Sequence, residues 1–337
     1  MLKEIGSEFM ADSYQTGRNA YATLCPYPKR YVLSGRTGLY LIAQELKAQA
    51  KLRVALPAYC CGSMVAPFVD AGIQVCFYEK VVPCDAQAVL IMDYFGYLSE
   101  KTAVFAHNCS QRGLTVIVDA TQTAFSKSEA YEIADYIVVS YRKWFDCLCA
   151  AVYSKNGFLI PAYRKDAEEY RCMWRNAAQK KRAYCDDKVG DKQTFLDLYK
   201  AANTLLAKDY IGYKAHDAEI AKLETADAEH IRSKRRANAE YLFSALRGKG
   251  ILLFDTLKPE DCPLHVPITL PAEQRDRLRS ALTAQAVYCP AHWPVDENYP
   301  YRKTILHDTE ISLVCDQRYS IENIKREAEI VLNFMAE

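Results

Sequence analysis

Two short segments carry side chains that could make and break bonds, and each follows an apolar run. Ser140-Tyr141-Arg142-Lys143-Trp144 places a lysine among aromatic residues just after the run 136–139. A lysine in apolar surroundings has a lowered pKa, and its neutral amine attacks carbonyl carbons. Asp119 ends a second apolar run, 116–118, and Gln122 follows it closely. These segments therefore offer a nucleophilic amine and a carboxylate.

Two further segments form turns between a strand and a helix, and the first of them suits the binding of an anion. Ser34-Gly35-Arg36-Thr37-Gly38-Leu39 opens a stretch of helical length, and 57–63 makes a similar turn. A helix N-terminus offers free backbone N–H groups and the positive end of a dipole, which suits phosphate. An ordinary capped helix would have the same sequence features. The chain contains no G-x-G-x-x-G and no G-x-x-x-x-G-K-[ST] motif, which disfavours a dinucleotide or nucleoside-triphosphate site.

The elements that must position these segments alternate through the first 150 residues. Apolar runs predict strands at 52–56, 73–78, 88–92, 116–118, 136–139 and 150–153, with helices such as 38–50 and 64–71 between them. Alternating strands and helices indicate an α/β sheet covered on both faces. Parallel sheets bind ligands at the carboxyl ends of their strands, so we expect the chemistry at that edge.

The second half of the chain has a different character. Charge rises after residue 163, and 219–246 shows a broken helical period with a basic cluster, Arg232, Lys234, Arg235 and Arg236, which we interpret as a solvated helix face. Strands are predicted at 251–254, 265–268 and 311–315, and helices at 272–284 and 321–335. We therefore expect a large domain over 1–230, which includes the N-terminal segment, and a small C-terminal α+β domain over 231–337.

Composition excludes several classes of protein. The 337 residues carry a net charge of +1, which gives no electrostatic case for nucleic acid or an anionic membrane as partner. No apolar run is long enough to span a membrane, and 1–16 lacks the apolar core of a secretory signal. We expect a cytoplasmic protein whose 13 cysteines are mostly buried thiols, without disulfides or a metal site.

The four segments together meet the needs of pyridoxal 5'-phosphate. The lysine binds the aldehyde, and helix N–H groups and hydroxyls bind the phosphate. A carboxylate at Asp119, 24 residues before Lys143, keeps the ring nitrogen protonated.

The sequence resembles the DegT/DnrJ/StrS-type aminotransferases, which are fold-type-I pyridoxal-phosphate enzymes. The matching segments are 34–39, 56–60, 70–72, 94–96, 118–122, 140–144, 235–242, 289–293 and 312–320. The resemblance covers most of the chain except about 160–225. It implies a mixed, mostly parallel sheet with helices on both faces, followed by a small C-terminal domain.

The resemblance also implies roles at the cofactor ring. Lys143 forms the internal aldimine and then moves the proton between cofactor and substrate carbons. Asp119 pairs with the pyridine nitrogen, and Gln122 hydrogen-bonds the ring hydroxyl. The family usually has an aromatic residue stacked on the ring at the position of Cys61, so Cys61 joins the predicted cofactor residues and the stacking partner is unassigned.

At the phosphate, the resemblance implies Gly35, Arg36 and Thr37, mainly through main-chain N–H groups, with a hydroxyl from Ser140. The family typically uses L-glutamate as amino donor and a keto-sugar nucleotide as acceptor, and it works as a homodimer. The Asn-Tyr-Arg motif that in the family normally reaches the active site of the partner subunit is absent here.

Two substrate contacts are candidates further along the chain. His292 could contact substrate, or it could belong to a packed domain junction. Arg318 could anchor a carboxylate, or it could form a structural ion pair with Asp316.

Other functions stay open on the same scaffold. A different pyridoxal-phosphate reaction is one: a lyase, a dehydratase, or a desulfurase using Cys262 or Cys289. Lys143 disfavours the dehydratase branch, which has histidine at that position. A non-catalytic interaction protein is the other alternative, and the Asp119/Lys143 pair disfavours it.

Overall fold

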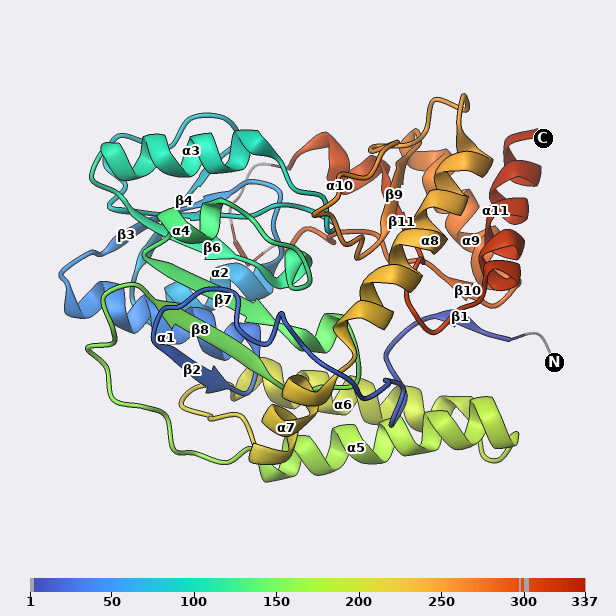
Figure 1. Cartoon of the computed structure of the whole chain (residues 1–337), viewed down its shortest axis with the longest axis horizontal. Coiled ribbons are helices and arrows are strands. Elements are labelled where there is room, and N and C mark those ends of the chain that lie inside the picture. The colour runs from blue at the N-terminus through green and yellow to red at the C-terminus, as the bar shows by residue number, and fades with distance from the viewer. Residues whose placement is uncertain (1–2, 297, 300–302, 337) are drawn as a thin grey trace.

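The computed structural model describes residues 3–296, 298–299 and 303–336. A seven-stranded sheet of order β2-β8-β7-β6-β5-β3-β4 forms its centre (Figure 1). The strands are β2 (Lys29–Val32), β3 (Arg53–Pro57), β4 (Gln74–Tyr78), β5 (Ala88–Ile91), β6 (Thr115–Asp119), β7 (Tyr136–Ser140) and β8 (Ala150–Ser154). Neighbouring strands from β4 to β7 are parallel, and β8 is antiparallel to both β7 and β2. This mixed, mostly parallel sheet confirms the predicted fold class.

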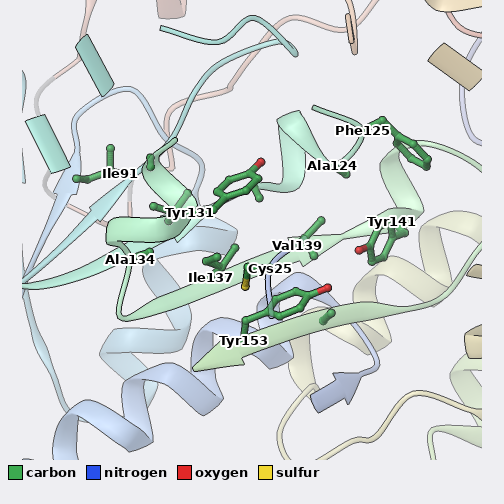
Figure 2. Close-up of a cluster of buried hydrophobic side chains, with 14 of the residues drawn as sticks. Cys25, Ile91, Ala124, Phe125, Tyr131, Ala134, Ile137, Val139, Tyr141 and Tyr153 are labelled. Carbon is green, nitrogen blue, oxygen red and sulfur yellow. The ribbon is translucent and has the colours of Figure 1, made fainter. Parts of the chain in front are cut away.

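Helices cover both faces of the sheet, which is why every residue of its central strands β5, β6, β7 and β8 is buried. Successive strand residues point to opposite faces. Ile137 and Val139 pack toward α3 (Glu100–Gln111) and α4 (Ala130–Ile133), whereas Val138 packs toward α1 (Gly35–Ala48) and α2 (Gly62–Asp70). Figure 2 shows the first of these clusters, with Tyr131 of α4 above β7 and Tyr153 on β8. The core therefore lies in two layers, one on each side of the strands.

Glycines bring α1 (Gly35–Ala48) close to the strands that carry the candidate site. A Cβ atom on Gly38 would lie 2.8 Å from Val138 and 2.9 Å from Val152, so only glycine allows this approach to β7 and β8. A Cβ on Gly35, one turn earlier, would lie 3.2 Å from the Cβ of Ser140. The start of α1 is thus packed against the end of β7. The next helix, α2, begins at Gly62 with Cys61 as its N-cap.

A helical hairpin follows the sheet and lies along its lower edge in Figure 1. It consists of α5 (Glu168–Arg182), a π-helical turn (Ala183–Asp187) and α6 (Lys192–Lys208), joined by a core that includes Trp174, Phe195 and Tyr199. A short helix, α7 (Asp217–Thr225), leads from the hairpin to the C-terminal unit.

The C-terminal unit begins with α8 (Ala228–Leu246), the long diagonal helix of Figure 1. Its remaining elements are β9 (Val266–Thr269), α9 (Ala272–Ala284), β10 (Val287–Tyr288), α10 (Ile305–Thr309), β11 (Glu310–Leu313) and α11 (Ile321–Ala336). β11 pairs antiparallel with β9. The two-residue strand β1 (Ile5–Gly6) pairs with β10, so the chain's N-terminal segment runs beside this unit. The predicted division at residue 230 falls in the first turn of α8 and stays a prediction.

Several local expectations were wrong. Residues 251–254 form no strand and make a single bridge, between Leu252 and Ile268. A short apolar run cannot by itself distinguish a strand from buried irregular chain. β2 escaped prediction because its first three residues are only half-buried. By contrast, the broken helical period of 219–246 does correspond to two helices, α7 and α8, because Asp227 accepts from the N–H of His230 and caps the second.

All 13 cysteines are free thiols, and eight of them are buried. Among the described residues, no group of His, Cys, Asp or Glu could hold a metal ion. No described helix is both long and apolar enough to cross a membrane.

Candidate active site

A cavity of about 650 Å³ lies where the ends of β6 and β7 and the starts of α1 and α2 face the C-terminal unit. Every predicted site residue except Thr37 lines it. The lining includes Gly35, Arg36, Cys61, Asp119, Gln122, Ser140, Lys143, His292 and Arg318. Residues from four segments of the large sheet unit and two of the C-terminal unit thus meet around one space.

Lys143 ends the 3-10 turn that follows β7 and projects into this cavity. Dense protein surrounds the side chain, yet it contacts solvent through the cavity. Burial and the adjacent Arg142 guanidinium lower the pKa of the amine, and Glu8 acts in the opposite direction. Among the described residues, Lys143 has no hydrogen bond and no ion pair. It is therefore an available amine with an increased neutral fraction.

The peptide after Lys143 is fixed by residues from the C-terminal unit. The Trp144 carbonyl accepts from Gln317 Nε2 at 2.7 Å and from Arg235 at 3.4 Å. The Trp144 indole donates to the Thr121 carbonyl at 2.8 Å. Arg235 is 1% exposed, so the predicted solvated face is wrong for this residue, and also for buried Arg232. Both guanidiniums donate hydrogen bonds to backbone carbonyls, Arg232 to that of Pro259 and Arg235 to that of Pro263.

Asp119 ends β6 and is buried at the edge of the cavity. Its Oδ1 accepts from the Thr121 N–H at 2.9 Å, and no described cation pairs with it. Burial raises the pKa of this carboxyl, although the Thr121 hydrogen bonds oppose the shift. Gln122 Oε1 accepts from the Phe95 N–H, which leaves the amide N–H groups of Gln122 for the cavity.

The start of α1 presents backbone donors to the same space. Ser34 Oγ accepts from the Thr37 N–H at 3.2 Å, whereas the N–H groups of Gly35 and Arg36 have no acceptor among the described residues. The Thr37 hydroxyl donates to the Tyr210 carbonyl at 2.9 Å and lies outside the lining. Thr37 therefore holds the helix start in place, and its predicted contact with phosphate has no geometric support.

Cys61 lines the cavity from the N-cap of α2, with its Sγ 2.9 Å from Ser63 Oγ. The indole of Trp293 also lines the cavity, and both side chains pack against the core under α1 and α2. The Trp293 ring lies 5.0 Å from that of Tyr59. An aromatic side chain from the C-terminal unit is thus present near the position where the sequence has cysteine.

The two candidate substrate residues have polar partners of their own. His292 Nδ1 lies 3.0 Å from Ser312 Oγ, and its backbone N–H donates to Glu310 at 2.7 Å. The Arg318 guanidinium forms two hydrogen bonds with Asp316, of 2.7 and 2.9 Å. Two more reach the carbonyls of Ser7 and Glu8. The Arg318 geometry thus matches the structural ion pair that was the alternative interpretation.

Sequence reasoning missed several lining residues. Glu8 arrives on the segment after β1, which reaches the cavity because β1 pairs with β10. Asn203 arrives on α6, and His265 precedes β9 with a buried Nδ1 that has no hydrogen-bond partner. Nothing in the local sequence marks these three positions. Arg142, directly before Lys143, was within reach of the motif but received no role.

Comparison with known proteins identifies the fold. No protein-family model matches the chain, and no curated protein matches it in sequence. A DegT DnrJ EryC1 StrS aminotransferase from Brucella abortus aligns over 92% of this chain and 86% of its own, with 15% identity and a TM-score of 0.59. The PLP form of the sugar aminotransferase Spr1654 from Streptococcus pneumoniae, described as putative, aligns over 99% of both chains, with 11% identity and a TM-score of 0.66.

A third structure, DesI in the presence of its TDP-sugar product, aligns over 99% of this chain and 95% of its own, with 15% identity and a TM-score of 0.65. At these identities the likeness concerns the fold, and it extends over nearly the whole chain in each alignment. The chain therefore has the fold of the DegT/DnrJ/EryC1/StrS sugar aminotransferases.

Proposed function

We propose that this protein is a pyridoxal-phosphate-dependent aminotransferase. One observation carries the proposal: Lys143 and Asp119 open into the same cavity, and among the described residues neither side chain has a partner of opposite charge. Burying the Asp119 carboxylate without a partner is costly, and the surrounding protein lowers the pKa of the Lys143 amine, so a ligand that satisfies both explains why they are kept.

The donor set fits pyridoxal phosphate. Asp119 suits a protonated ring nitrogen, because its carboxylate is buried at the edge of the cavity and no described cation pairs with it. The N–H groups of Gly35 and Arg36 and the Ser140 hydroxyl suit the phosphate. Gln122 presents amide N–H groups, which suit a ring hydroxyl oxygen. Lys143 supplies the amine that carbonyl chemistry requires.

Pyridoxal phosphate, when bound, supplies an aldehyde and an electron-accepting ring. The residues of this chain then have separate tasks. Asp119 holds a proton on the ring nitrogen, and Lys143 Nζ accepts a proton from the substrate carbon and returns it. Gln317 and Arg235 fix the peptide next to Lys143 through the Trp144 carbonyl. The C-terminal unit supplies the facing wall of the cavity.

We infer that the amino donor is L-glutamate and that the acceptor is a keto-sugar nucleotide. The support comes from the shared fold. The DesI structure was obtained in the presence of its TDP-sugar product, and Spr1654 is described as a putative sugar aminotransferase. A cavity of about 650 Å³ is in the usual range for small-molecule sites. A homodimer and a cytoplasmic location stay predictions. Light scattering tests the first, and the 13 free thiols suit the second.

Lys143→Ala tests the assignment. The purified protein is incubated with pyridoxal phosphate and reduced with borohydride, and peptide mass spectrometry then locates the bound pyridoxyl group. We expect the group on Lys143 of the wild type and on no specific lysine of the variant. Glutamate-dependent amine transfer should fall on the order of 10³-fold or more. Exposed Lys127, changed to Ala, is the matched control.

Two outcomes would change the conclusion. A pyridoxyl group on another lysine would move the catalytic residue, and wild-type protein that never acquires the group would favour a non-catalytic role. The desulfurase alternative needs a mobile, exposed cysteine. Cys262 and Cys289 are both buried, with exposed fractions of 0% and 3%, so this structure does not favour it.

A further inference from the structure

Two guanidiniums flank the start of α1, and both line the cavity. Arg36 belongs to the first turn of the helix, and Arg142 precedes Lys143. In the described part of the chain, neither forms an ion pair with a carboxylate. Two arginines without carboxylate partners around one set of free backbone N–H groups make a strongly anion-attracting end of the cavity.

Neutral groups hold both guanidiniums in position. Arg142 Nη1 donates to the Tyr170 hydroxyl at 3.2 Å and to Asn203 Oδ1 at 3.1 Å, and its guanidinium lies 4.9 Å from the Trp174 ring centre. These partners come from α5 and α6. Arg36 lies 5.5 Å from the Tyr210 ring centre and donates to the Leu206 carbonyl at 3.5 Å.

Aromatic rings and neutral oxygens orient a guanidinium without cancelling its charge. One lining carboxylate, Glu8, acts electrostatically on Arg142 but forms no ion pair with it. The remaining donors of Arg142 therefore stay available. A phosphate monoester is a dianion whose oxygens accept several hydrogen bonds, and arginine binds such a group with its planar fork.

Resting on the proposed function, we propose that Arg142 is a second arginine for the cofactor's phosphate group, oriented by Tyr170 and Asn203 of the α5–α6 hairpin. The phosphate end of the site is then built from one chain: the α1 start, the Ser140 hydroxyl, Arg36 and Arg142. The hairpin, which lies in the part of the sequence with the weakest resemblance to the family, acquires a purpose as the support of Arg142.

The test compares pyridoxal phosphate with pyridoxal, which lacks the phosphate. Dissociation constants are measured spectroscopically for the wild type, Arg142→Gln and Asn203→Ala. Loss of one charge-assisted contact should weaken the binding of pyridoxal phosphate about 10- to 100-fold in Arg142→Gln and less in Asn203→Ala. The affinity for pyridoxal should fall much less, because its change reports only the effect of Arg142 on the Lys143 amine. Arg182→Gln, which changes a half-exposed arginine on α5, is the control.

A second measurement does not depend on the cofactor. Calorimetric titration with inorganic phosphate should detect binding to the wild type and a weaker affinity in Arg142→Gln. Arg142→Lys keeps the charge without the fork and should lie between them, and thermal unfolding without phosphate identifies any variant that fails to fold.

Equal losses for pyridoxal phosphate and pyridoxal, or an unchanged affinity for both phosphate compounds in Arg142→Gln, would overturn this role of Arg142. Either result is compatible with a pyridoxyl group on Lys143, so the proposed function would stand. Wild-type protein without that group would instead contradict the proposed function itself.

Discussion

The two walls of the cavity differ in whether their charged side chains have partners within the protein. The sheet wall, formed by Arg36, Asp119, Arg142 and Lys143, presents charged groups without partners of opposite charge among the described residues. The C-terminal wall, formed by Arg235, His292, Asp316 and Arg318, presents groups whose hydrogen bonds lie within the protein. Residues on both walls line the same space, so lining a cavity does not by itself make a residue functional.

The difference follows from the cost of burying charge. A buried ion that lacks a partner is unstable unless a ligand completes it, whereas a paired ion has nothing left to offer a ligand. Arg318 already donates to Asp316 and to two backbone carbonyls. A substrate carboxylate would therefore have to displace Asp316 to bind Arg318.

Asp119→Asn should have the largest effect on turnover among the changes that test this comparison. Asparagine keeps the size of the side chain but cannot hold a proton on the ring nitrogen. We expect glutamate-dependent turnover to fall on the order of 10²- to 10³-fold. The melting temperature without cofactor should stay the same or rise, since burial raises the pKa of this carboxyl and its charge is costly. Single-turnover kinetics and thermal unfolding give the two values.

A fall in stability of cofactor-free Asp119→Asn would contradict the comparison. It would mean that the Asp119 carboxylate is needed by the fold and not by a ligand.

Asp316→Asn should lower the stability of the protein, because it breaks a charge pair on the C-terminal wall. Burial would raise the pKa of Asp316, but the Arg318 guanidinium outweighs it and lowers the pKa to about 2. Breaking this buried pair should cost roughly 3–5 kcal/mol of unfolding free energy. Denaturant unfolding at neutral pH measures the loss. An unchanged stability, with loss of substrate binding, would show that Arg318 serves the substrate after all.

The ion pair of Asp316 and Arg318 should also make the stability of the protein depend on pH. Because the folded pKa of Asp316 is lowered, its stabilising contribution is complete above the ordinary carboxyl pKa and disappears as the pH falls through about 2. Wild-type protein should therefore lose stability more steeply than Asp316→Asn between about pH 4 and pH 2. Parallel curves for the two proteins would contradict the assigned shift.

Thr37→Val should have the smallest effect. The Thr37 hydroxyl bonds to the Tyr210 carbonyl and lies outside the cavity, so its loss should cost about 1 kcal/mol of stability. The affinity for pyridoxal phosphate should stay within about twofold. A tenfold weaker affinity would instead support the phosphate contact predicted from sequence.

Much of the site's frame was predictable from local pattern. The six strands predicted in the first 150 residues are confirmed within two residues at each end. The turn at 34–39 does open a helix at the sheet edge. These features depend on residues close together in sequence: an apolar run makes a buried strand, and Gly35 and Gly38 let α1 approach β7. The functional roles assigned by resemblance stay predictions.

Tertiary structure alone decided which charged groups are free. Arg235 and Arg232 looked like solvated side chains, but packing of α8 against carbonyls of distant segments buries them. Arg142 is held by Tyr170 and Asn203, which are 28 and 61 residues away in sequence. Charge pairing depends on neighbours in space, and those neighbours are known only once the chain has folded.

The sequence by itself was enough to identify Lys143, Asp119 and the glycine-containing helix start at Gly35 as candidates, because each is recognisable from its own strand or turn. The tertiary structure brought them around one cavity, and it decided which of the arginines there form ion pairs with carboxylates. It did so because contacts such as β1 with β10 join residues some 280 positions apart, beyond the reach of any local pattern.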